Sequence, residues 1–255
     1  MSAALAVAHL EKRFGGLVAT GDVSFSVPDG SVTALVGPNG AGKTTLFNLI
    51  TNLVPPDAGS VHLFGQNLAG LAGNAVAALG LIRTFQSARV FPGMTALENV
   101  MAGAFRTGSH GVLPYALWLP RARAAERALR ERALSLLDLI GLQRYALSHA
   151  TDLPIGAQKL LEVARALMAR PRLLLLDEPA AGLNDAETEE LAALLVAVRH
   201  SGVSLLVVEH NMGLVMNVAD QVVVLDAGRV IAMGPPAAVQ RDPAVLAAYL
   251  GMDSA

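Results

Sequence analysis

The chain contains 255 residues, of which 53% are hydrophobic, and it carries a formal net charge of −2. It has no cysteine, which excludes disulfide bonds and thiolate metal sites, and its mild acidity argues against a broad nucleic-acid footprint. No apolar run approaches the ~18 residues that a membrane helix needs, and the first residues lack a basic segment, so we expect neither a transmembrane helix nor a signal peptide. Such a hydrophobic sequence indicates a buried parallel sheet, an apolar partner, or both.

Short apolar runs alternate with helical patterns along the chain. The expected strands cover residues 32–37, 173–176, 203–209 and 221–225, and the expected helices cover residues 42–53, 187–200 and 211–218. Near the start, FSVPDGSVTAL and AGSVHLFG have the pattern of antiparallel hairpin strands, and DAGR at residues 226–229 is typical of a hairpin turn. The alternation predicts an α/β core with a mostly parallel sheet, together with an N-terminal antiparallel β subdomain.

The middle of the chain, from about residue 98 to residue 170, contains no convincing strand. Apolar residues there recur at spacings of three and four, as on one face of a helix that Gly141 would cap: Ala122, Ala125, Leu129, Ala133, Leu136, Leu137 and Ile140. The opposite face, which we interpret as solvated, carries arginines: Arg121, Arg123, Arg127, Arg130 and Arg132. We therefore expect one domain, with the core and β subdomain in residues 1–97 and 171–255 and an inserted all-helical subdomain in residues 98–170.

The segment GPNGAGKTT matches the phosphate-binding pattern GxxxxGK[ST] between a predicted strand and a predicted helix. Its glycines let the backbone turn so that amides point at phosphate oxygens, and the following helix adds its positive N-terminal end. We expect Lys43 to reach the β- and γ-phosphates, Thr44 to bind Mg²⁺ and Thr45 to lie near the α-phosphate. The predicted nucleotide-binding residues are Gly37, Pro38, Asn39, Gly40, Ala41, Gly42, Lys43, Thr44 and Thr45.

A pair of acids, Asp177 and Glu178, ends the predicted buried strand LLLLD. In P-loop enzymes an acid at the end of a neighbouring strand holds the Mg²⁺ shell, and we expect this role for Asp177. A second acid beside it can position and activate a water molecule, which we expect of Glu178. Together with the phosphate-binding loop, the pair predicts a P-loop NTPase core.

With these motifs, nearly the whole chain resembles the ATP-binding cassette (ABC) ATPases. The resemblance implies that Phe14 of LEKRFGG lies on the adenine of ATP, although a core phenylalanine is the alternative. Gln86 of RTFQ matches the Q-loop, which contacts Mg²⁺ or the attacking water and leads to the membrane partner. His210 of VVEHNM matches the switch histidine, which holds that water and the γ-phosphate. The segment AAGLND resembles the D-loop, with Asn184 at a position where the family often has an aspartate.

Longer segments resemble the ATPases of branched-chain amino-acid importers in particular: GKTTLFNLITNL, RTFQSARVFPGMTALENV, LPIGAQKLLEVARALMARPRLLLLDEPAAGLN and GPPAAVQRDPAVLAAYLG. The signature of that group is similar to LPYGQQR, so Pro154 follows the group whereas Ala157 and Lys159 depart from it. The resemblance implies a head-to-tail dimer of two cassettes. In such a dimer Gly156 contacts, in trans, the ATP held by the other subunit.

The resemblance also implies partners and a location. The expected function is an ATPase that uses ATP and Mg²⁺ to power a membrane importer for branched-chain or related amino acids. The expected partners are transmembrane permease subunits, a second ABC ATPase that is either a paralogue or another copy of this chain, and indirectly a periplasmic solute-binding protein. We expect a peripheral protein on the cytoplasmic face of the inner membrane, without nucleic acid. VFPGM at residues 90–94 is either a buried turn or part of a groove for the permease.

Two other classes stay open at this point. Soluble ABC ATPases that act on nucleic acid or ribosomes usually carry two cassettes or a long coiled-coil insertion between P-loop and signature, and the segment between Lys43 and Pro154 is too short for such arms. A P-loop nucleotide kinase or GTPase would leave the signature-like segment unexplained, and the guanine motif [NT]KxD is absent from the sequence.

Overall fold

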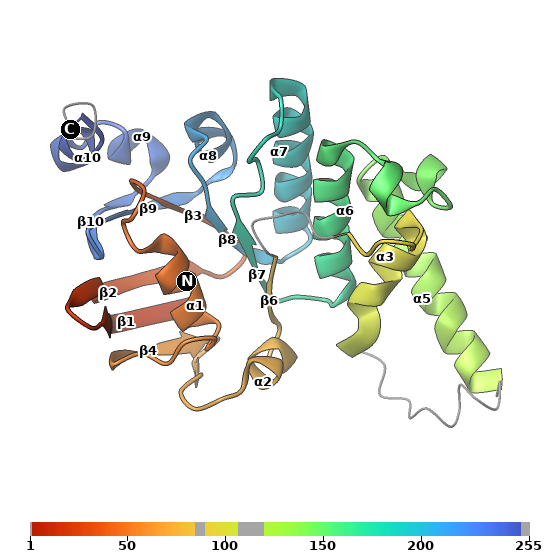
Figure 1. The fold of residues 1–255 in the computed structure, drawn as a ribbon, viewed down its shortest axis with the longest axis horizontal. Helices are drawn as coiled ribbons and strands as arrows, with labels where there is room; N and C mark the ends of the chain where they lie inside the picture. The colour runs from red at the N-terminus through yellow and green to blue at the C-terminus, as the bar shows by residue number, and fades with distance from the viewer. Residues whose placement is uncertain (1, 85–89, 107–119, 251–255) are drawn as a thin grey trace. The chain divides into compact units, whose positions relative to one another are not determined.

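The computed structural model of the chain describes residues 2–84, 90–106 and 120–250, so the predicted site residue Gln86 lies outside the described part. The chain divides into two compact units, one made of residues 1–83, 172–181 and 188–255 and the other of residues 84–171 and 182–187. The first unit holds both sheets, and the second is helical (Figure 1). The predicted fold class is confirmed: an α/β core with an antiparallel β subdomain and a helical insertion.

The antiparallel sheet has the strand order β2-β1-β4-β5. Its strands are β1 (Ala3–Phe14), β2 (Leu17–Pro28), β4 (Ala58–Leu63) and β5 (Gln66–Asn67). The prediction for AGSVHLFG is confirmed, since β4 pairs antiparallel with β1 and β5. The hairpin predicted for FSVPDGSVTAL is wrong, because β2 ends at Pro28 and the next strand joins the other sheet. That strand, VTALV, is buried at every residue, which suits the centre of a parallel sheet better than a hairpin.

The second sheet has the strand order β10-β9-β3-β8-β7-β6. Its strands are β3 (Val32–Val36), β6 (Leu81–Arg83), β7 (Leu173–Asp177), β8 (Ser204–Val208), β9 (Gln221–Asp226) and β10 (Arg229–Gly234). Neighbouring strands are parallel except for β9 and β10, which form a hairpin around the predicted DAGR turn. Because β3, β8 and β7 are adjacent and parallel, the residues that follow these three strands meet at one edge of the sheet.

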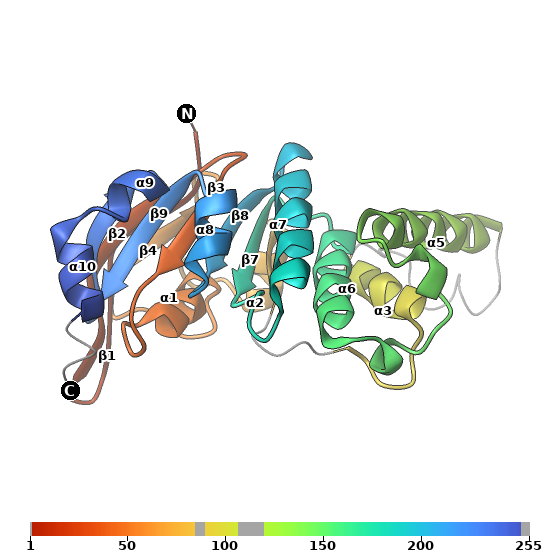
Figure 2. The same ribbon diagram turned by 90° about the horizontal axis from the view of Figure 1, so that it is seen from above.

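Both faces of this sheet are covered (Figure 2). Helices α8 (Met212–Val218), α9 (Pro236–Val239) and α10 (Pro243–Leu250) pack on the face that contains Ala34 and Val36 of β3. The opposite face, with Leu35, packs against α1 (Lys43–Ile50), α2 (Gly73–Ala78) and the antiparallel sheet. Helix α7 (Asp185–His200) follows β7 along the chain. A sheet buried on both faces explains the high apolar content of the sequence.

The helical unit contains α3 (Ala96–Ala102), α5 (Pro120–Leu139), α6 (Ile155–Met168) and 3₁₀ turns at Gly103–Arg106, Gln143–Tyr145 and Ala150–Asp152. Its described residues form no strand, as expected, apart from an isolated bridge between Thr95 and His149. The predicted apolar face of α5 is buried at Ala133 and Leu137. Gly141 has a φ of 68°, as the predicted helix cap requires.

Arg132 departs from the solvated face that we predicted for the arginines of α5. Its guanidinium donates a hydrogen bond to the Leu167 carbonyl at 3.1 Å. Burial lowers the pKa of Arg132, and the nearby Arg170 lowers it further. The carbonyl of Leu167 lies in the last turn of α6 and also accepts a hydrogen bond from the Arg170 N–H at 3.0 Å. Arg132 therefore ties α5 to the end of α6 rather than facing water.

The helical unit begins at residue 84, earlier than the predicted boundary near residue 98. Part of this earlier stretch is held by Asn99, which is fully buried on α3. Its side-chain amide donates to the carbonyls of Met94 and Thr95 at 3.4 and 3.0 Å, and its oxygen accepts from the Phe91 N–H at 2.7 Å. These bonds join the segment that precedes α3 to the helical unit.

Candidate functional site

The predicted phosphate-binding loop joins β3 to α1, at the sheet edge where β7 and β8 also end. Two of its glycines are required by close backbone packing. A Cβ atom on Gly37 would collide with the Leu225 carbonyl, and one on Gly42 would collide with the Ala19 carbonyl. Gly42 also has a φ of 101°, which side chains rarely adopt. The backbone of β9 and β2 therefore fixes the course of the loop.

Lys43 begins α1, and its side chain folds back over the loop. Its ammonium donates to the carbonyl oxygens of Gly37 and Pro38 at 2.7 and 2.9 Å. Burial lowers the pKa of Lys43, while the charges of Glu178 and Asp177 oppose that shift. The structure thus brings the cation of the loop close to both acids that follow the LLLL run, as the two motifs predict.

Asp177 ends β7 and is only 6% exposed. Its carboxylate forms an ion pair with Arg83, whose Nη2 lies 2.7 Å from Oδ2. Arg83 ends β6, and it also donates to the side-chain oxygen of Asn48 on α1 at 2.7 Å. Sequence reasoning missed this arginine, because its partners lie on other elements far along the chain. The available signal was a charged residue at the end of an apolar run, which requires a partner when buried.

We expect Arg83→Ala to lower the free energy of unfolding by about 3 kcal/mol, because it leaves the buried Asp177 carboxylate without its ion-pair partner. The nearby Lys43 ammonium keeps the loss at the lower end of the range for buried pairs. Urea unfolding followed by circular dichroism measures the change. Arg199→Ala is the matched control, since Arg199 and Asp220 pair at 2.8 Å with side chains 34% and 33% exposed, and we expect it to cost under ~1 kcal/mol. Equal losses in the two variants would contradict the role of Arg83.

Glu178 follows β7 with a φ of 49°, in the left-handed region that a residue with a side chain seldom occupies. Its N–H donates to the Val208 carbonyl at 2.9 Å. Its Oε1 atom lies 3.0 Å from Nε2 of His210, the second residue after β8. The side chains of His210 and Glu178 are 40% and 21% exposed, so the pair is open to water. A carboxylate and an imidazole at this distance can orient a water molecule and take up its proton.

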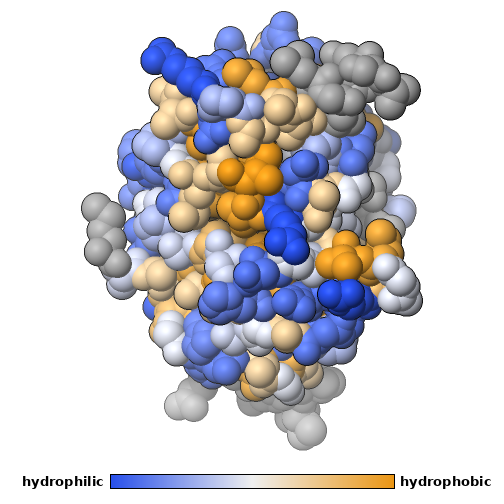
Figure 3. Space-filling model, turned by 90° about the vertical axis from the view of Figure 1, so that its left-hand side faces the viewer, coloured by the Kyte–Doolittle hydropathy of each residue, from blue (hydrophilic) through white to orange (hydrophobic). Residues whose placement is uncertain are grey.

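Phe14 ends β1 and is 49% exposed, which excludes the alternative of a core phenylalanine. Leu17 and Val18 on the same hairpin are also exposed. The space-filling view of this side of the first unit shows apolar surface between polar strips (Figure 3). The ammonium of Lys12 lies 5.6 Å from the centre of the Phe14 ring. A flat ring that is accessible on one unit can accept a planar ligand.

The signature-like segment LPIGAQK begins α6. Pro154 is the N-cap residue with a φ of −54°, where its missing N–H costs little. Gly156 lies against the side chain of Glu187, and a Cβ atom on Gly156 would collide with that carboxylate. Glu187 and Asn184 exchange two bonds of 3.0 Å as a capping box for α7. Within this unit, Gly156 therefore makes room for a carboxylate, a neighbour that its sequence position does not reveal.

Mg²⁺ prefers oxygen ligands, and at nucleotide sites it is held by one or two protein side chains together with phosphate oxygens. In the described part of the chain, no cluster of three or more His, Asp or Glu side chains could hold a metal without such phosphates. Thr44 and Asp177 supply a hydroxyl and a carboxylate oxygen, on α1 and at the end of β7. This donor set fits Mg²⁺ that arrives with a nucleotide.

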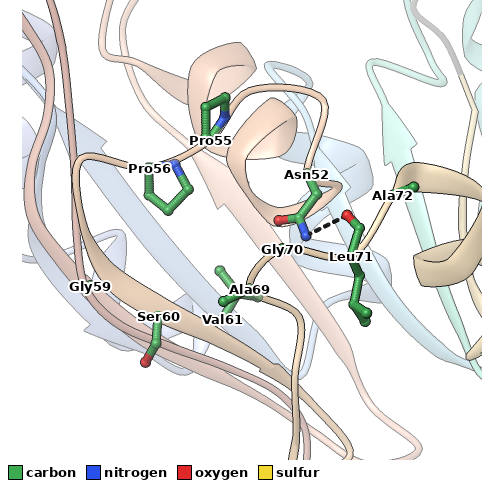
Figure 4. Close-up of a pocket in the computed structure, with 10 residues that line it drawn as sticks. All are labelled: Asn52, Pro55, Pro56, Gly59, Ser60, Val61, Ala69, Gly70, Leu71 and Ala72. Carbon is green, nitrogen blue, oxygen red and sulfur yellow. Dashed lines mark hydrogen bonds between the residues drawn. The ribbon is translucent and has the colours of Figure 1, made fainter.

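A separate cavity of about 460 Å³ lies beside the antiparallel sheet. Its lining includes Asn52, Pro55, Ser60 and Leu71, as the close-up shows (Figure 4). The amide of Asn52 donates to the Leu71 carbonyl at 3.1 Å, so its polar group binds the protein backbone. No charged side chain and no predicted site residue lines this cavity, and we assign no role to it.

A glycine-rich loop closed on a buried lysine, with an acid pair at the end of β7, defines a P-loop nucleoside triphosphatase. In the described part of the chain, every helix is too short or too polar to cross a membrane.

Comparison with known proteins narrows the class. A family profile described as ABC transporter matches residues 20–181, and one described as branched-chain amino acid ATP-binding cassette transporter matches residues 229–251. The chain is 42% identical, over 97% of each sequence, to the high-affinity branched-chain amino acid transport ATP-binding protein BraF of Pseudomonas aeruginosa. It is 40% identical, over 97% of each sequence, to LivG of Escherichia coli, which carries the same description.

Solved structures agree with these relatives. A nucleotide-free ATP-binding cassette from an ABC transporter matches with a TM-score of 0.83 and 31% identity, covering 97% of this chain and 98% of that one. The ADP conformation of the cassette MJ1267 matches with a TM-score of 0.84 and 29% identity, covering 98% and 100%. The chain belongs to the ABC transporter family, as its ATP-hydrolysing cassette.

Proposed function

We propose that this cassette powers a membrane importer for branched-chain or related amino acids. The observation that carries the proposal is the Glu178–His210 pair, 3.0 Å apart at the sheet edge that also holds the Lys43 loop. This arrangement supports hydrolysis of ATP. The solute class is supported by the names of BraF and LivG, which match 97% of the chain. The non-transport alternative gains no support from these relatives.

The proposed ATP site assigns a role to each predicted residue. The amides of the loop from Gly37 to Thr45 and the Lys43 ammonium bind the phosphates, while Phe14 supports the adenine. Glu178 accepts the proton of the attacking water, and His210 holds that water against the γ-phosphate. Thr44 and Asp177 would hold Mg²⁺, with Gln86 as a third ligand, and the ion would neutralise charge on the phosphates.

We propose that the cassette works as a head-to-tail dimer, with a paralogous ATPase or a second copy of itself. Gly156 of one subunit then faces the ATP of the other, at the first turn of α6, where free helix amides favour an anion. Phe91 and Met94 are 46% and 39% exposed in the helical unit, which supports VFPGM as part of a surface for the permease. We place the complex on the cytoplasmic face of the inner membrane, served by a periplasmic solute-binding protein.

The test is co-purification of the cassette with its permease subunits, followed by ATPase assays in proteoliposomes with the solute-binding protein and a panel of amino acids. We expect slow hydrolysis by the largely monomeric chain alone, and stimulation of the complex by leucine, isoleucine or valine. The same complex without binding protein is the control. Brisk, cooperative hydrolysis by the isolated chain, or indifference to every amino acid in the panel, would count against the transport role.

A further inference from the structure

Glu209 is a buried acid between β8 and the proposed catalytic histidine, and the mechanism above does not use it. Only 3% of the residue is exposed. Its Oε1 atom accepts a hydrogen bond from the Ala180 N–H at 2.7 Å. Its Oε2 atom accepts from the N–H groups of His210 and Asn211, at 3.0 and 3.2 Å. One carboxylate therefore binds three backbone amides, which compensates for its burial.

These amides belong to two different loops. Ala180 lies two residues beyond Glu178, in the loop that follows β7, whereas His210 and Asn211 lie in the loop that follows β8. The N–H of Glu209 itself donates to the Leu35 carbonyl of β3 at 3.3 Å, just before the phosphate-binding loop. Glu209 thus connects the ends of β3, β7 and β8, the three strands that precede Lys43, Glu178 and His210.

We infer that Glu209 is a positioning residue, which clamps the loops after β7 and β8 so that Glu178 and His210 stay within reach of one water molecule. The inference rests on the roles proposed above for Glu178 and His210. Glu178 adopts a left-handed backbone with a φ of 49°, and such a conformation persists only where the surroundings over-determine it. The bond from the Ala180 N–H to Glu209 is one of the contacts that fix this turn.

The chemistry of the clamp requires a carboxylate. Both carboxylate oxygens accept hydrogen bonds, and all three facing groups are N–H donors. A glutamine of the same size keeps one acceptor oxygen but turns an NH₂ group toward one of the two loops. The NH₂ group then faces a backbone N–H, two donors that cannot bond, and that loop loses its hydrogen bond to residue 209. An aspartate keeps the charge but is one methylene too short to reach both loops.

The experiment compares Glu209→Gln and Glu209→Asp with the wild-type chain in ATPase and ATP-binding assays. We expect both variants to lose kcat by about 10-fold, the size typical of residues that orient a reacting group. ATP affinity should change by less than about twofold, because the phosphate-binding loop keeps its contacts. Glu98→Gln is the matched control: Glu98 also accepts a backbone N–H, from Thr95 at 2.8 Å, but lies on α3, and its kcat should stay at the wild-type value. Thermal melting confirms that each variant is folded.

A double variant separates positioning from general structural support. If Glu209 acts by placing His210, Glu209→Gln should cost little further kcat in a His210→Ala background, whereas independent effects would multiply. Wild-type kcat in either folded Glu209 variant, or multiplying effects, would overturn the positioning role. Wild-type kcat in His210→Ala alone would overturn the proposed function at this site, and the positioning role with it. An impaired His210→Ala beside an unimpaired Glu209→Gln would overturn the positioning role only.

Discussion

Glu178→Gln should abolish turnover while ATP binding stays intact. The variant removes the group that accepts the proton of the attacking water, and loss of a general base typically costs about 10²- to 10⁴-fold in kcat. The Lys43 ammonium donates to two carbonyls of the phosphate-binding loop, and the variant leaves both of these donors and acceptors in place. Single-turnover hydrolysis of labelled ATP measures the rate, and titration of a fluorescent ATP analogue measures the affinity.

Glu178→Gln should leave the fold unchanged. Glutamine has the same shape as glutamate and meets the same backbone constraint at the φ of 49°, so the melting temperature should stay close to that of the wild type. The variant also removes the negative charge of Glu178, which opposes the lowering of the Lys43 pKa by burial. The pKa of Lys43 should therefore be lower in the variant than in the wild type. Turnover near the wild-type rate in a folded variant would sink the assignment of Glu178 as the base.

Lys43→Ala should lose nucleotide affinity by about 10- to 100-fold, since each hydrogen bond to a charged group contributes about 1.5–3 kcal/mol. The ammonium donates hydrogen bonds to the loop carbonyls of Gly37 and Pro38, at 2.7 and 2.9 Å. When ATP binds, we expect the same group to reach the β- and γ-phosphates. Titration with a fluorescent ATP analogue gives the dissociation constant directly.

Arg130→Ala is the matched control for this change, because it also removes one positive charge, from an exposed position on α5. Its affinity for the analogue should equal that of the wild-type chain. If both variants lost affinity to the same extent, the effect would come from net charge and not from the phosphate-binding loop. Unchanged affinity in Lys43→Ala would remove the loop as the phosphate site.

The parts of the site that were predictable from sequence are those whose residues lie within one short, contiguous segment. The phosphate-binding loop needs glycines and a lysine at fixed spacing, and the acid pair needs only a buried strand before it. The structure places Lys43 close to Glu178 and Asp177, as those motifs imply. The strand and helix predictions around them held for the same reason, since periodicity is a local property.

The parts that escaped prediction depend on partners far along the chain. Arg83 and Asp177 are joined across neighbouring strands, and Glu209 meets Ala180 only because β7 and β8 are adjacent. In the sequence, Glu209 is merely the residue before a histidine. In the signature segment, Pro154 is the N-cap of α6, whereas the neighbour of Gly156 is the side chain of Glu187, which lies beyond the end of β7.

At Glu178, stability and catalysis favour different residues, because the left-handed backbone favours glycine whereas the proposed reaction requires a carboxylate. A glycine there would avoid a conformational cost of about 1–2 kcal/mol, and an asparagine part of it, yet neither could act as a base. Selection for stability alone would therefore favour replacement of glutamate at this position. Retention of glutamate at this position in related sequences would therefore indicate selection for ATP turnover, because selection for stability alone would not keep it.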